Sequence, residues 1–354
     1  IERTDNMHLA TAARIYSPVP GSRVPLAVEK LTNGEEDLLT LVGRHRDQLS
    51  ELLLTHGALL FRGFAVNDAE TFGRFLDSIS EKRLDYVYRS TPRKLVGDRV
   101  FTSTAYPPAL EIPLHQENAY QREWPMKLAL CCIVPATSGG ETPLADMVKV
   151  TARLPAELLD RFEERGVRYV RHYHEGTDLP WQTVFQTDDR EVLANYCRDH
   201  GIDHVWLDEN TLRTSQQCQG IAYHPVTGDR LFFNQAHLFH VSNLGDVGAK
   251  ALIEVFGADR LPRNATFADG VEIDASDLQL IRNAYASEAV AFPWQAGDVV
   301  VVDNMQVAHG RRPFKGKREV LAGMSDPFVP SADWQLRPAG AGTVVAPSSL
   351  SHAE

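Results

Sequence analysis

Two histidines and one carboxylate have the types and spacing of a metal site. His115 and Glu117 stand two positions apart, and His309 follows much later in the chain. Two imidazoles and one carboxylate can cover one face of an octahedral ion and leave the opposite face open. An open face lets a non-haem Fe(II) bind O2 and a co-substrate, whereas four protein ligands would close the site and make it structural. The pattern therefore predicts an iron oxygenase.

The neighbouring sequence predicts two strands that could bring these ligands together. Residues 128–134 form a short apolar run, and residues 298–303 are four valines between two aspartates. Both segments are typical of buried strands. We expect His115 and Glu117 to point to the same side of one extended segment. We expect His309 just past the end of the second strand, facing the first inside a barrel.

Other histidine pairs are alternatives for a metal site. The chain has 13 histidines, so some metal-like spacings are expected by chance. His172 and His174 have the period of a strand, and His237 and His240 have the spacing of a helical turn. Neither pair has a flanking signature, so ordinary core or surface positions are the simpler interpretation. We expect Asn234, with Gln235 and His237, to line the substrate pocket in a lid.

Four sequence blocks carry a resemblance to a known family. They are residues 112–120 (IPLHQENAY), 124–126 (WPM), 138–146 (SGGETPLAD) and 303–311 (DNMQVAHGR), with Arg318 behind the last. Together they resemble the taurine dioxygenase-like and clavaminate synthase-like branch of Fe(II)/2-oxoglutarate oxygenases. The resemblance runs from roughly residue 56 to the strand after Arg318 and is weakest over about 151–290. It implies a mixed α/β fold: a double-stranded β-helix (jelly-roll) core with flanking helices and a long structured insertion.

The resemblance also implies cofactors and their ligands. His115, Glu117 and His309 become the catalytic Fe(II) ligands, with 2-oxoglutarate chelating the iron and O2 as co-substrate. Arg318 becomes the clamp for the far carboxylate of 2-oxoglutarate, because a guanidinium can meet a carboxylate through two hydrogen bonds and keeps its charge. The hydroxyl of Thr142 would bind the same carboxylate.

Arg311 and Arg312 are competitors for the clamp, since both lie nearer to His309 in the chain. We place Arg318 ahead of them because it is expected on a returning strand over residues 318–324 that can face the barrel interior. Arg311 stays a second candidate for binding 2-oxoglutarate.

Departures from the family pattern bear on the substrate. Glu117 replaces the aspartate of taurine dioxygenase, and a carboxylate here argues against a halogenase, which has a small residue in this place. The sulfonate-binding arginine of taurine dioxygenase would fall near Ala322, so taurine is not the expected substrate. The blocks favour the syringomycin-pathway type of amino-acid hydroxylase, acting in natural-product and antibiotic biosynthesis.

The expected reaction is hydroxylation of an unactivated C–H bond of an amino acid, free or bound to a carrier protein, with release of succinate and CO2. Desaturation or cyclisation by the same cofactors is an open alternative. A zinc hydrolase or a non-catalytic metal-binding protein would use the same three ligands without a 2-oxoglutarate clamp. Loss of 2-oxoglutarate binding in Arg318→Ala would separate these classes.

Composition narrows the partners and the compartment. The 354 residues carry a net charge of −11, which disfavours nonspecific binding to nucleic acid or to an anionic membrane. No apolar run approaches the roughly 18 residues of a membrane span, and no signal-peptide pattern opens the chain. Four cysteines form neither a disulfide framework nor a CxxC zinc set. We therefore expect a protein of the reducing cytoplasm; its oligomeric state stays open.

Several polar residues near the ligand triplet are candidates for binding an anionic substrate. The candidate cations are Arg89, Arg93, Arg122 and Lys127, and Asn118 is a further candidate contact. For each cation a solvated surface charge is the simpler interpretation.

We expect one catalytic domain over residues 1–354. Its core would cover about 56–150 and 289–328, an insertion or lid about 151–288, and a loop tail about 329–354. Periodicity and end signals predict the individual elements. The predicted helices cover 37–56 (ending at Gly57), 68–80, 155–165 and 188–200; the predicted strands cover 58–62 and 167–171; a hairpin covers 222–234.

Overall fold

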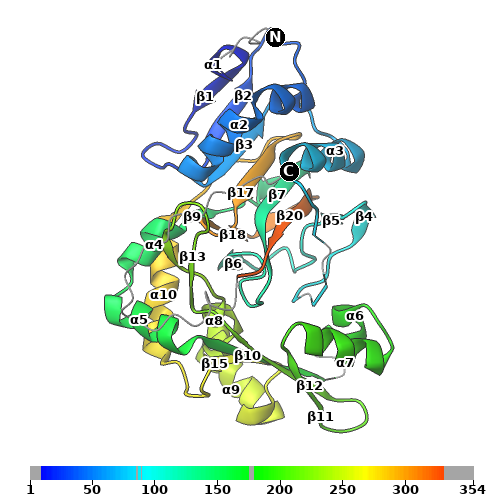
Figure 1. Ribbon diagram of the computed structural model, residues 1–354, viewed down its shortest axis with the longest axis vertical. Helices are drawn as coiled ribbons and strands as arrows, with labels where there is room; N and C mark the ends of the chain where they lie inside the picture. Colours follow the sequence, from blue (N-terminus) through cyan, green and yellow to red (C-terminus); the bar gives the residue numbers. More distant parts are fainter. Residues whose placement is uncertain (1–8, 85–86, 89, 175–178, 331–354) are drawn as a thin grey trace, which may run out of the picture.

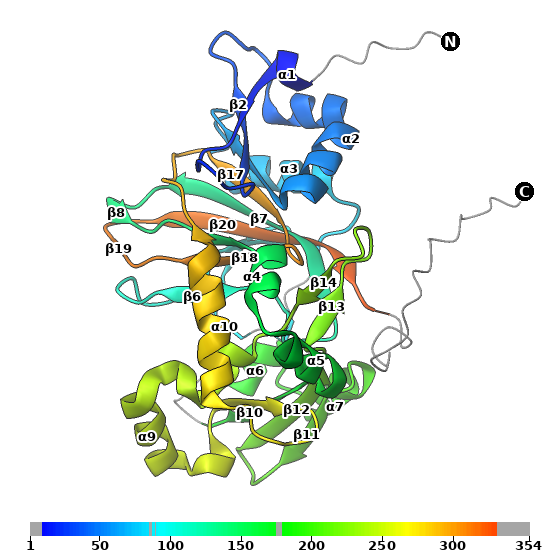
Figure 2. The ribbon, with the colours of Figure 1, turned by 90° about the vertical axis from the view of Figure 1, so that its left-hand side faces the viewer.

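The computed structural model describes residues 9–84, 87, 88, 90–174 and 179–330. Figures 1 and 2 show a large sheet in the upper half of the molecule and a smaller sheet with most of the helices in the lower half. Residues 331–354, which make up most of the predicted tail, lie outside the described residues.

An eight-stranded sheet forms the upper half (Figure 1). All its neighbouring strands are antiparallel except β2 and β3, which run parallel. The sheet takes in β1 and β2, which precede the predicted start of the core at residue 56. Its order is β1 (Ala13–Tyr16), β2 (Leu26–Lys30), β3 (Ala58–Arg62), β17 (Val299–Asp303), β7 (Trp124–Val134), β20 (Glu319–Phe328), β5 (Val100–Thr102) and β4 (Leu95–Gly97).

Both faces of this sheet are buried, which explains the continuous run of valines in β17. Val299 and Val301 pack on one face with helices α2 (Leu38–His56) and α3 (Ala69–Ile79). Val300 and Val302 pack on the opposite face, in a cluster shared with a second sheet. Strand alternation thus gives β17 two different partners.

The second sheet lies against the face opposite the helices. Leu144 and Val307 from this sheet share the buried cluster with Val300 and Val302. The strands occur in the order β16 (Ala289–Val290), β9 (Leu144–Asp146), β18 (Val307–Arg311) and β6 (Ile112–His115), and a separate two-stranded pair joins β8 (Ser138–Gly139) to β19 (Phe314–Lys315).

The chain between the two halves of the core folds into structured elements of its own (Figure 2). A four-stranded sheet has the order β11 (Asp203–Trp206), β12 (Leu212–Cys218), β10 (Val167–Tyr173), β15 (Arg263–Phe267), and a hairpin joins β13 (Ile221–Tyr223) to β14 (Arg230–Phe232). The helices are α4 (Met147–Arg153), α5 (Ala156–Arg165), α6 (Trp181–Phe185), α7 (Arg190–Asp199), α8 (Ala236–Phe239), α9 (Gly245–Phe256) and α10 (Ala275–Glu288), with 3-10 turns at Val241–Leu244 and Ala258–Arg260.

Local sequence signals explain where the helices begin and end. Asp37 caps α2 by accepting a hydrogen bond from the backbone N–H of Thr40, and Gly57 ends it in the left-handed conformation. Asp68 caps α3 in the same way. The predicted helices over 37–56, 68–80, 155–165 and 188–200, the strands over 58–62 and 167–171, and the hairpin are confirmed within a few residues. Only one short helix, α1 (Leu9–Ala12), precedes the first strand among the described residues.

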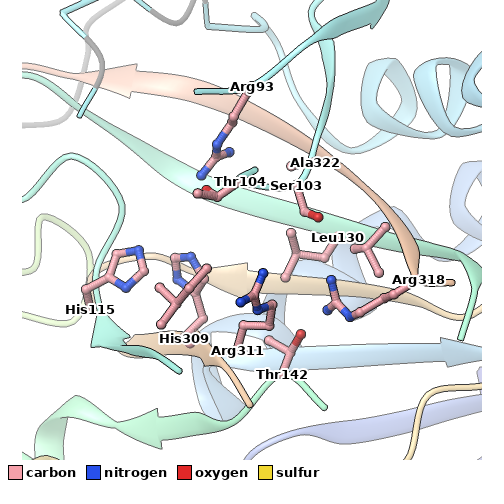
Figure 3. A pocket seen from close by; sticks show the side chains of 13 residues that line it. Arg93, Ser103, Thr104, His115, Leu130, Thr142, His309, Arg311, Arg318 and Ala322 are labelled. Carbon is pink, nitrogen blue, oxygen red and sulfur yellow. The ribbon is translucent and has the colours of Figure 1, made fainter. Parts of the chain in front are cut away.

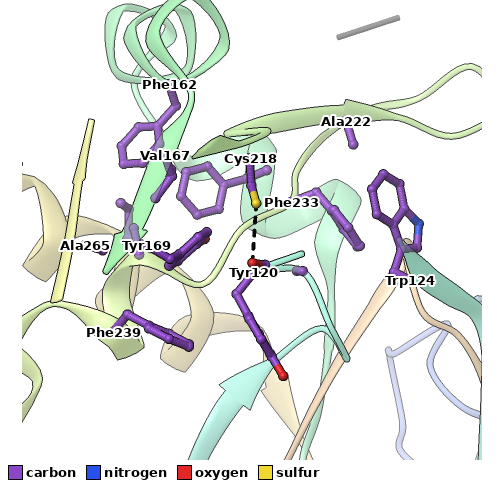
Figure 4. Close-up of a cluster of buried hydrophobic side chains, with 14 of the residues drawn as sticks. Tyr120, Trp124, Phe162, Val167, Tyr169, Cys218, Ala222, Phe233, Phe239 and Ala265 are labelled. Atoms are coloured by element: carbon purple, nitrogen blue, oxygen red, sulfur yellow. Dashed lines mark hydrogen bonds between the residues drawn. The ribbon is translucent and has the colours of Figure 1, made fainter. Parts of the chain in front are cut away.

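Aromatic packing joins the lower half to the segment that follows Glu117. Tyr120 and Trp124 belong to the same buried cluster as Tyr169 and Phe233 (Figure 4). The Sγ of Cys218 donates a hydrogen bond to the backbone carbonyl of Tyr120 at 3.3 Å. No described helix is both long and apolar enough to cross a membrane.

Gly57 tests how closely the end of α2 approaches β18. Its φ is +71°, and an added Cβ would lie 2.6 Å from Cγ2 of Val307. We predict that Gly57→Ala lowers the free energy of unfolding by about 2–5 kcal/mol, from a left-handed backbone cost of about 1–2 kcal/mol and an overpacking cost of about 1–3 kcal/mol. The midpoint of urea denaturation, followed by tryptophan fluorescence, measures it.

Gly21→Ala is the matched control, because its φ is +77° and no atom lies within 4 Å of an added Cβ. Only the backbone cost is expected there. Equal losses in the two variants would contradict the close packing of α2 against β18.

Candidate metal centre and the pocket beside it

Strand pairing brings the two predicted histidine ligands together. In the antiparallel pair of β6 and β18, His115 lies opposite His309, and their ring centroids are 4.4 Å apart. The Nε2 of His309 lies 3.5 Å from Oε2 of Glu117. One donor atom from each of the three residues lies within 4.8 Å of the others. No fourth His, Cys, Asp or Glu of the described residues joins them, so these ligands could hold a metal from one side only.

His309 lies inside strand β18 and not in a loop past a strand, as the sequence had suggested. A tight turn leads from the end of β17 into β18, and these two strands belong to different sheets. That arrangement aims the His309 side chain into the space between the sheets.

Glu117 corrects the expectation of one extended segment, because β6 ends at His115 and Glu117 lies in the turn that follows. The side chain of Asn304 fixes this turn. Its Oδ1 accepts from the backbone N–H of Glu117 at 2.7 Å, and its Nδ2 donates to the carbonyl of Glu117 at 2.8 Å and to that of Pro125 at 2.9 Å. Asn304, and not strand alternation, therefore positions the carboxylate.

Buried polar residues hold the same turn from the other side. Gln235 Nε2 donates to the carbonyl of Gln116 at 2.6 Å, and Tyr285 donates its hydroxyl hydrogen to Oε1 of Gln116 at 3.1 Å. His237 Nε2 lies 3.0 Å from the carbonyl of Leu114. Gln235 and His237 thus support the backbone on either side of His115. They do not line the pocket beside the three ligands, although we had expected them to line the substrate pocket in a lid.

The histidines have the form that a metal requires. His115 Nδ1 lies 2.8 Å from the carbonyl of Pro113 and donates to it, which leaves the Nε2 lone pair for a metal. Burial, and then the neighbouring His309, lowers the pKa of His115 to about 3. The imidazole is therefore neutral at physiological pH, as a ligand must be. The buried Nδ1 of His309 has no hydrogen-bond partner among the described residues.

Arg93 makes an ion pair with the carboxylate of Glu117. Its Nη2 donates to Oε1 at 3.1 Å and to Oε2 at 2.9 Å. The side chains are 5% and 4% exposed. Burial alone would raise the pKa of Glu117, but the charge of Arg93 and the hydrogen bond from His309 hold that pKa well below its usual range. The surface interpretation of Arg93 is therefore wrong.

A pocket opens beside the three ligands, between the two sheets (Figure 3). Arg93 reaches in from one wall, whereas Arg311 and Thr142 lie on the opposite wall and Arg318 lies at the end away from the histidines. The lining residues are Arg93, Ser103, Thr104, Ile112, His115, Leu130, Thr142, His309, Gly310, Arg311, Arg318, Val320 and Ala322.

Arg318 is a partly buried cation that no acidic side chain of the described residues meets within ion-pair distance. Its Nε donates to the carbonyl of Gly140 at 2.9 Å. Burial, and then the charge of Arg311, lowers the pKa of Arg318 to about 10. An anion bound here would restore the lost solvation.

The hydrogen-bond partners of Arg311 and Thr142 indicate what each residue does in the pocket. The guanidinium of Arg311 donates to the carbonyls of Tyr106, Pro107 and Leu110 at 2.7 to 3.0 Å, so it holds the loop ahead of β6. Thr142 Oγ1 accepts a hydrogen bond from Nε1 of Trp294 at 3.2 Å, which orients its hydroxyl at the pocket wall.

The three expected substrate contacts lie outside this pocket. Arg122 donates from Nε to the carbonyl of Gln217 at 2.8 Å. Asn118 occupies the turn after Glu117 with a φ of +57°. Asn234 is fully buried and satisfies the backbone around α8, because it donates to the carbonyl of Gly220 and accepts from the N–H of Ala236.

The remaining candidates also have other roles or lie elsewhere. Lys127 pairs with Asp326 at 2.8 Å, and Arg89 lies outside the described residues. His172 bonds to the carbonyl of Leu261 and His174 to that of Arg260. Within the described part of the chain, no acidic residue or cysteine completes a metal site with this pair.

Comparison with known proteins identifies the family that this chain matches. Residues 27–324 match the taurine catabolism dioxygenase TauD, TfdA family. The chain is 41% identical over 285 residues to the dapdiamide synthesis protein DdaC of Enterobacter agglomerans, covering 80% of this chain and 87% of that protein. It is 33% identical over 321 residues to a clavaminate synthase-like protein of Arabidopsis thaliana, covering 88% and 92%. Its fold is similar to the crystal structure of AAD-2 with Mn(II) and N-oxalylglycine, with a TM-score of 0.50, 13% identity and coverage of 85% and 92%.

Asn304→Ala tests whether the Asn304 side chain positions the turn that contains Glu117. Because the turn would lose both backbone hydrogen bonds between Glu117 and Asn304, we predict Fe(II) affinity to fall about 10–100-fold, the usual effect of removing a group that orients a metal ligand. Anaerobic calorimetric titration measures the affinity. Asn283→Ala, at an exposed position of α10, is the control. Unchanged Fe(II) affinity in folded Asn304→Ala would show that the turn holds Glu117 without the hydrogen bonds to Asn304.

Proposed function

The chain belongs to the taurine catabolism dioxygenase TauD, TfdA family, and on that premise we propose that it hydroxylates an unactivated C–H bond of an amino-acid-like substrate. It is a 2-oxoglutarate-dependent non-haem iron dioxygenase, with O2 as co-substrate. This activity replaces the zinc hydrolase and the non-catalytic metal protein as alternatives. The observation that carries the proposal is the convergence of His115, Glu117 and His309 beside Arg318, which has no acidic partner among the residues that the structure describes.

His115, Glu117 and His309 are the proposed Fe(II) ligands. The donor set fits the metal because it combines two imidazoles with one ionised carboxylate, leaves one side of the ion open and is largely shielded from solvent. The buried, unpartnered Nδ1 of His309 and the bonded Nδ1 of His115 leave Nε2 of each ring facing the carboxylate side.

Arg318 and Thr142 are the proposed binding groups for the far carboxylate of 2-oxoglutarate. The guanidinium of Arg318 would gain a counter-ion by binding this carboxylate. Trp294 holds the Thr142 hydroxyl in the same pocket. Gly140 makes room for this clamp, since a Cβ there would lie 3.0 Å from Cδ of Arg318. Arg311 supports the pocket wall through its backbone contacts.

Iron and 2-oxoglutarate together supply the reduction of O2, coupled to decarboxylation to succinate and CO2 and to oxygen insertion into the substrate. The chain's own residues bind, orient and exclude water. Arg318 sets the direction of the co-substrate, Asn304 holds Glu117, and Leu130, Val320 and Ala322 supply apolar walls.

The proposed architecture is a double-stranded β-helix made of the eight-stranded and the four-stranded core sheets, within one catalytic domain. The buried cluster between the two sheets and the pocket at their junction support this arrangement. Residues of the insertion over about 151–288 would form the support and outer wall of the site.

An amino-acid-derived substrate is favoured over taurine. Ala322 lines the pocket, and the resemblance places the sulfonate-binding arginine of taurine dioxygenase near this position. The relative DdaC takes part in dapdiamide synthesis by its name, which supports a biosynthetic reaction on an amino-acid-like molecule. All four cysteines are buried thiols, which suits the reducing cytoplasm proposed for this enzyme.

Arg318→Gln tests the co-substrate clamp. We predict that the dissociation constant of 2-oxoglutarate, measured anaerobically with the Fe(II) protein, rises about 10–100-fold, because a charge-assisted pair contributes about 1.5–3 kcal/mol. Fe(II) affinity should stay within about twofold of wild type, since Arg318 touches none of the metal ligands. Arg122→Gln, which removes a guanidinium outside the pocket, is the control.

Unchanged 2-oxoglutarate affinity in Arg318→Gln would overturn the assignment of the clamp. Succinate release from a panel of amino acids would then be measured with the wild-type enzyme, and release that no amino acid stimulates would contradict the proposed substrate class.

A further inference from the structure

His224 is a buried histidine that the proposed metal site does not use. It follows directly after β13, in the hairpin formed by β13 and β14. Its side chain is fully buried, and its Nε2 lies 3.0 Å from Oδ2 of Asp303. Asp303 is the last residue of β17 and immediately precedes Asn304, whose side chain holds Glu117. The contact therefore joins the hairpin to the turn that contains Asn304.

Backbone hydrogen bonds fix which nitrogen of His224 carries the hydrogen. The backbone N–H groups of Val226 and Thr227 donate to its Nδ1 at 3.2 and 3.1 Å. A ring nitrogen that accepts hydrogen bonds carries no hydrogen, so the hydrogen of the imidazole lies on Nε2. Nε2 therefore donates to Asp303, and the ring links the two segments in one defined orientation.

Asp303 transmits this contact to the turn between β17 and β18. Its Oδ1 accepts from the backbone N–H of Met305 at 3.0 Å and from that of Gln306 at 3.1 Å. Its Oδ2 accepts from His224 and, at 3.3 Å, from Nε2 of Gln306. The carboxylate thus closes the turn around Asn304. Because a buried acceptor that loses its donor is costly, His224 constrains the orientation of Asp303.

A second contact from the same hairpin reaches the same turn. Nε2 of Gln116 donates to the backbone carbonyl of Phe232, in β14, at 3.2 Å and to that of Met305, in the turn, at 3.3 Å. Gln116 immediately precedes Glu117 in the chain. The hairpin is therefore bonded to the metal region at two places, and both contacts bear on the position of Glu117.

We propose that His224 is a positioning residue for the metal: through Asp303 it orients the turn whose Asn304 holds Glu117. This inference rests on the proposed function, since it takes Glu117 as an Fe(II) ligand. It extends that function because it makes the segment between the two halves of the core contribute to metal affinity, although none of the three proposed ligands lies in that segment.

Two substitutions separate the two contacts of His224. In His224→Asn the side-chain carbonyl replaces Nδ1 as acceptor for the N–H groups of Val226 and Thr227, but the side chain is too short to reach Asp303. In His224→Gln the longer amide replaces Nε2 as donor to Asp303 but offers no acceptor in the place of Nδ1. A role confined to the hairpin makes His224→Gln the more damaging change, whereas positioning of the metal makes His224→Asn the more damaging one.

Anaerobic calorimetric titration of the full chain with Fe(II) measures the affinity, and the midpoint of urea denaturation without metal reports folding. We expect Fe(II) affinity to fall about 10-fold in His224→Asn, the lower end of the effect of removing a group that orients a metal ligand. His224→Gln should restore most of the affinity, because the bond to Asp303 is kept. His204→Asn, on the outer strand β11, is the matched control and should bind Fe(II) as the wild type does.

Wild-type affinity in folded His224→Asn overturns the inference, and so does a larger loss of affinity in His224→Gln than in His224→Asn. If His224→Asn does not fold, folded His224→Gln decides: weak Fe(II) binding overturns the inference, and binding close to that of the wild type supports it.

A double variant tests the route through Asn304. Added to Asn304→Ala, His224→Asn should lower Fe(II) affinity by less than about twofold further, because both changes loosen the same turn and their effects do not add. A further loss of the full 10-fold would show that His224 acts by another route and would overturn the inference.

Failure of the proposed function gives a different result. In that case a folded His115→Ala variant binds Fe(II) as tightly as the wild type, before any His224 variant is compared.

Discussion

The antiparallel pairing of β6 with β18 is the constraint on which the site depends. It sets His115 opposite His309 across one ladder, although 193 residues separate them in the chain. The pairing in turn requires β18 to pack under β17, where the run of valines fills the space between two sheets. A shift of one residue in this register would turn His309 out of the pocket. Burial on both sides of the sheets is what fixes the register and thus the metal site.

Electrostatics explains why so many charged groups can lie in this space. Arg93 meets Glu117, and the partner proposed for Arg318 is the far carboxylate of 2-oxoglutarate. Asn304 accepts a hydrogen bond from the backbone N–H of Glu117, and Gln116 donates one to the backbone carbonyl of Met305. The apolar walls beside these polar groups make their interactions stronger than they would be in water.

The sequence predicted what local chemistry determines. Helix caps such as Asp37 and Gly57, the hairpin turn and the valine run of β17 were readable because their signals lie within a few residues. The ligand set was recognisable from the types and spacing of His115, Glu117 and His309 together with the family blocks. Arg93 and Asn304 were missed or misjudged, because their parts depend on contacts with Glu117 across 24 and 187 residues. Arg122 and Asn234 were expected near the substrate only from their proximity in the sequence, which the fold does not preserve.

The central claim is that three side chains and a carboxylate clamp form one Fe(II)/2-oxoglutarate site. Anaerobic absorbance titration of the metal-free protein with Fe(II) and then 2-oxoglutarate tests it most directly. The account predicts a weak visible charge-transfer band that needs both additions and is absent from a folded His115→Ala variant. Tight metal binding without the band in the wild type, or a band that persists unchanged in His115→Ala, would contradict it.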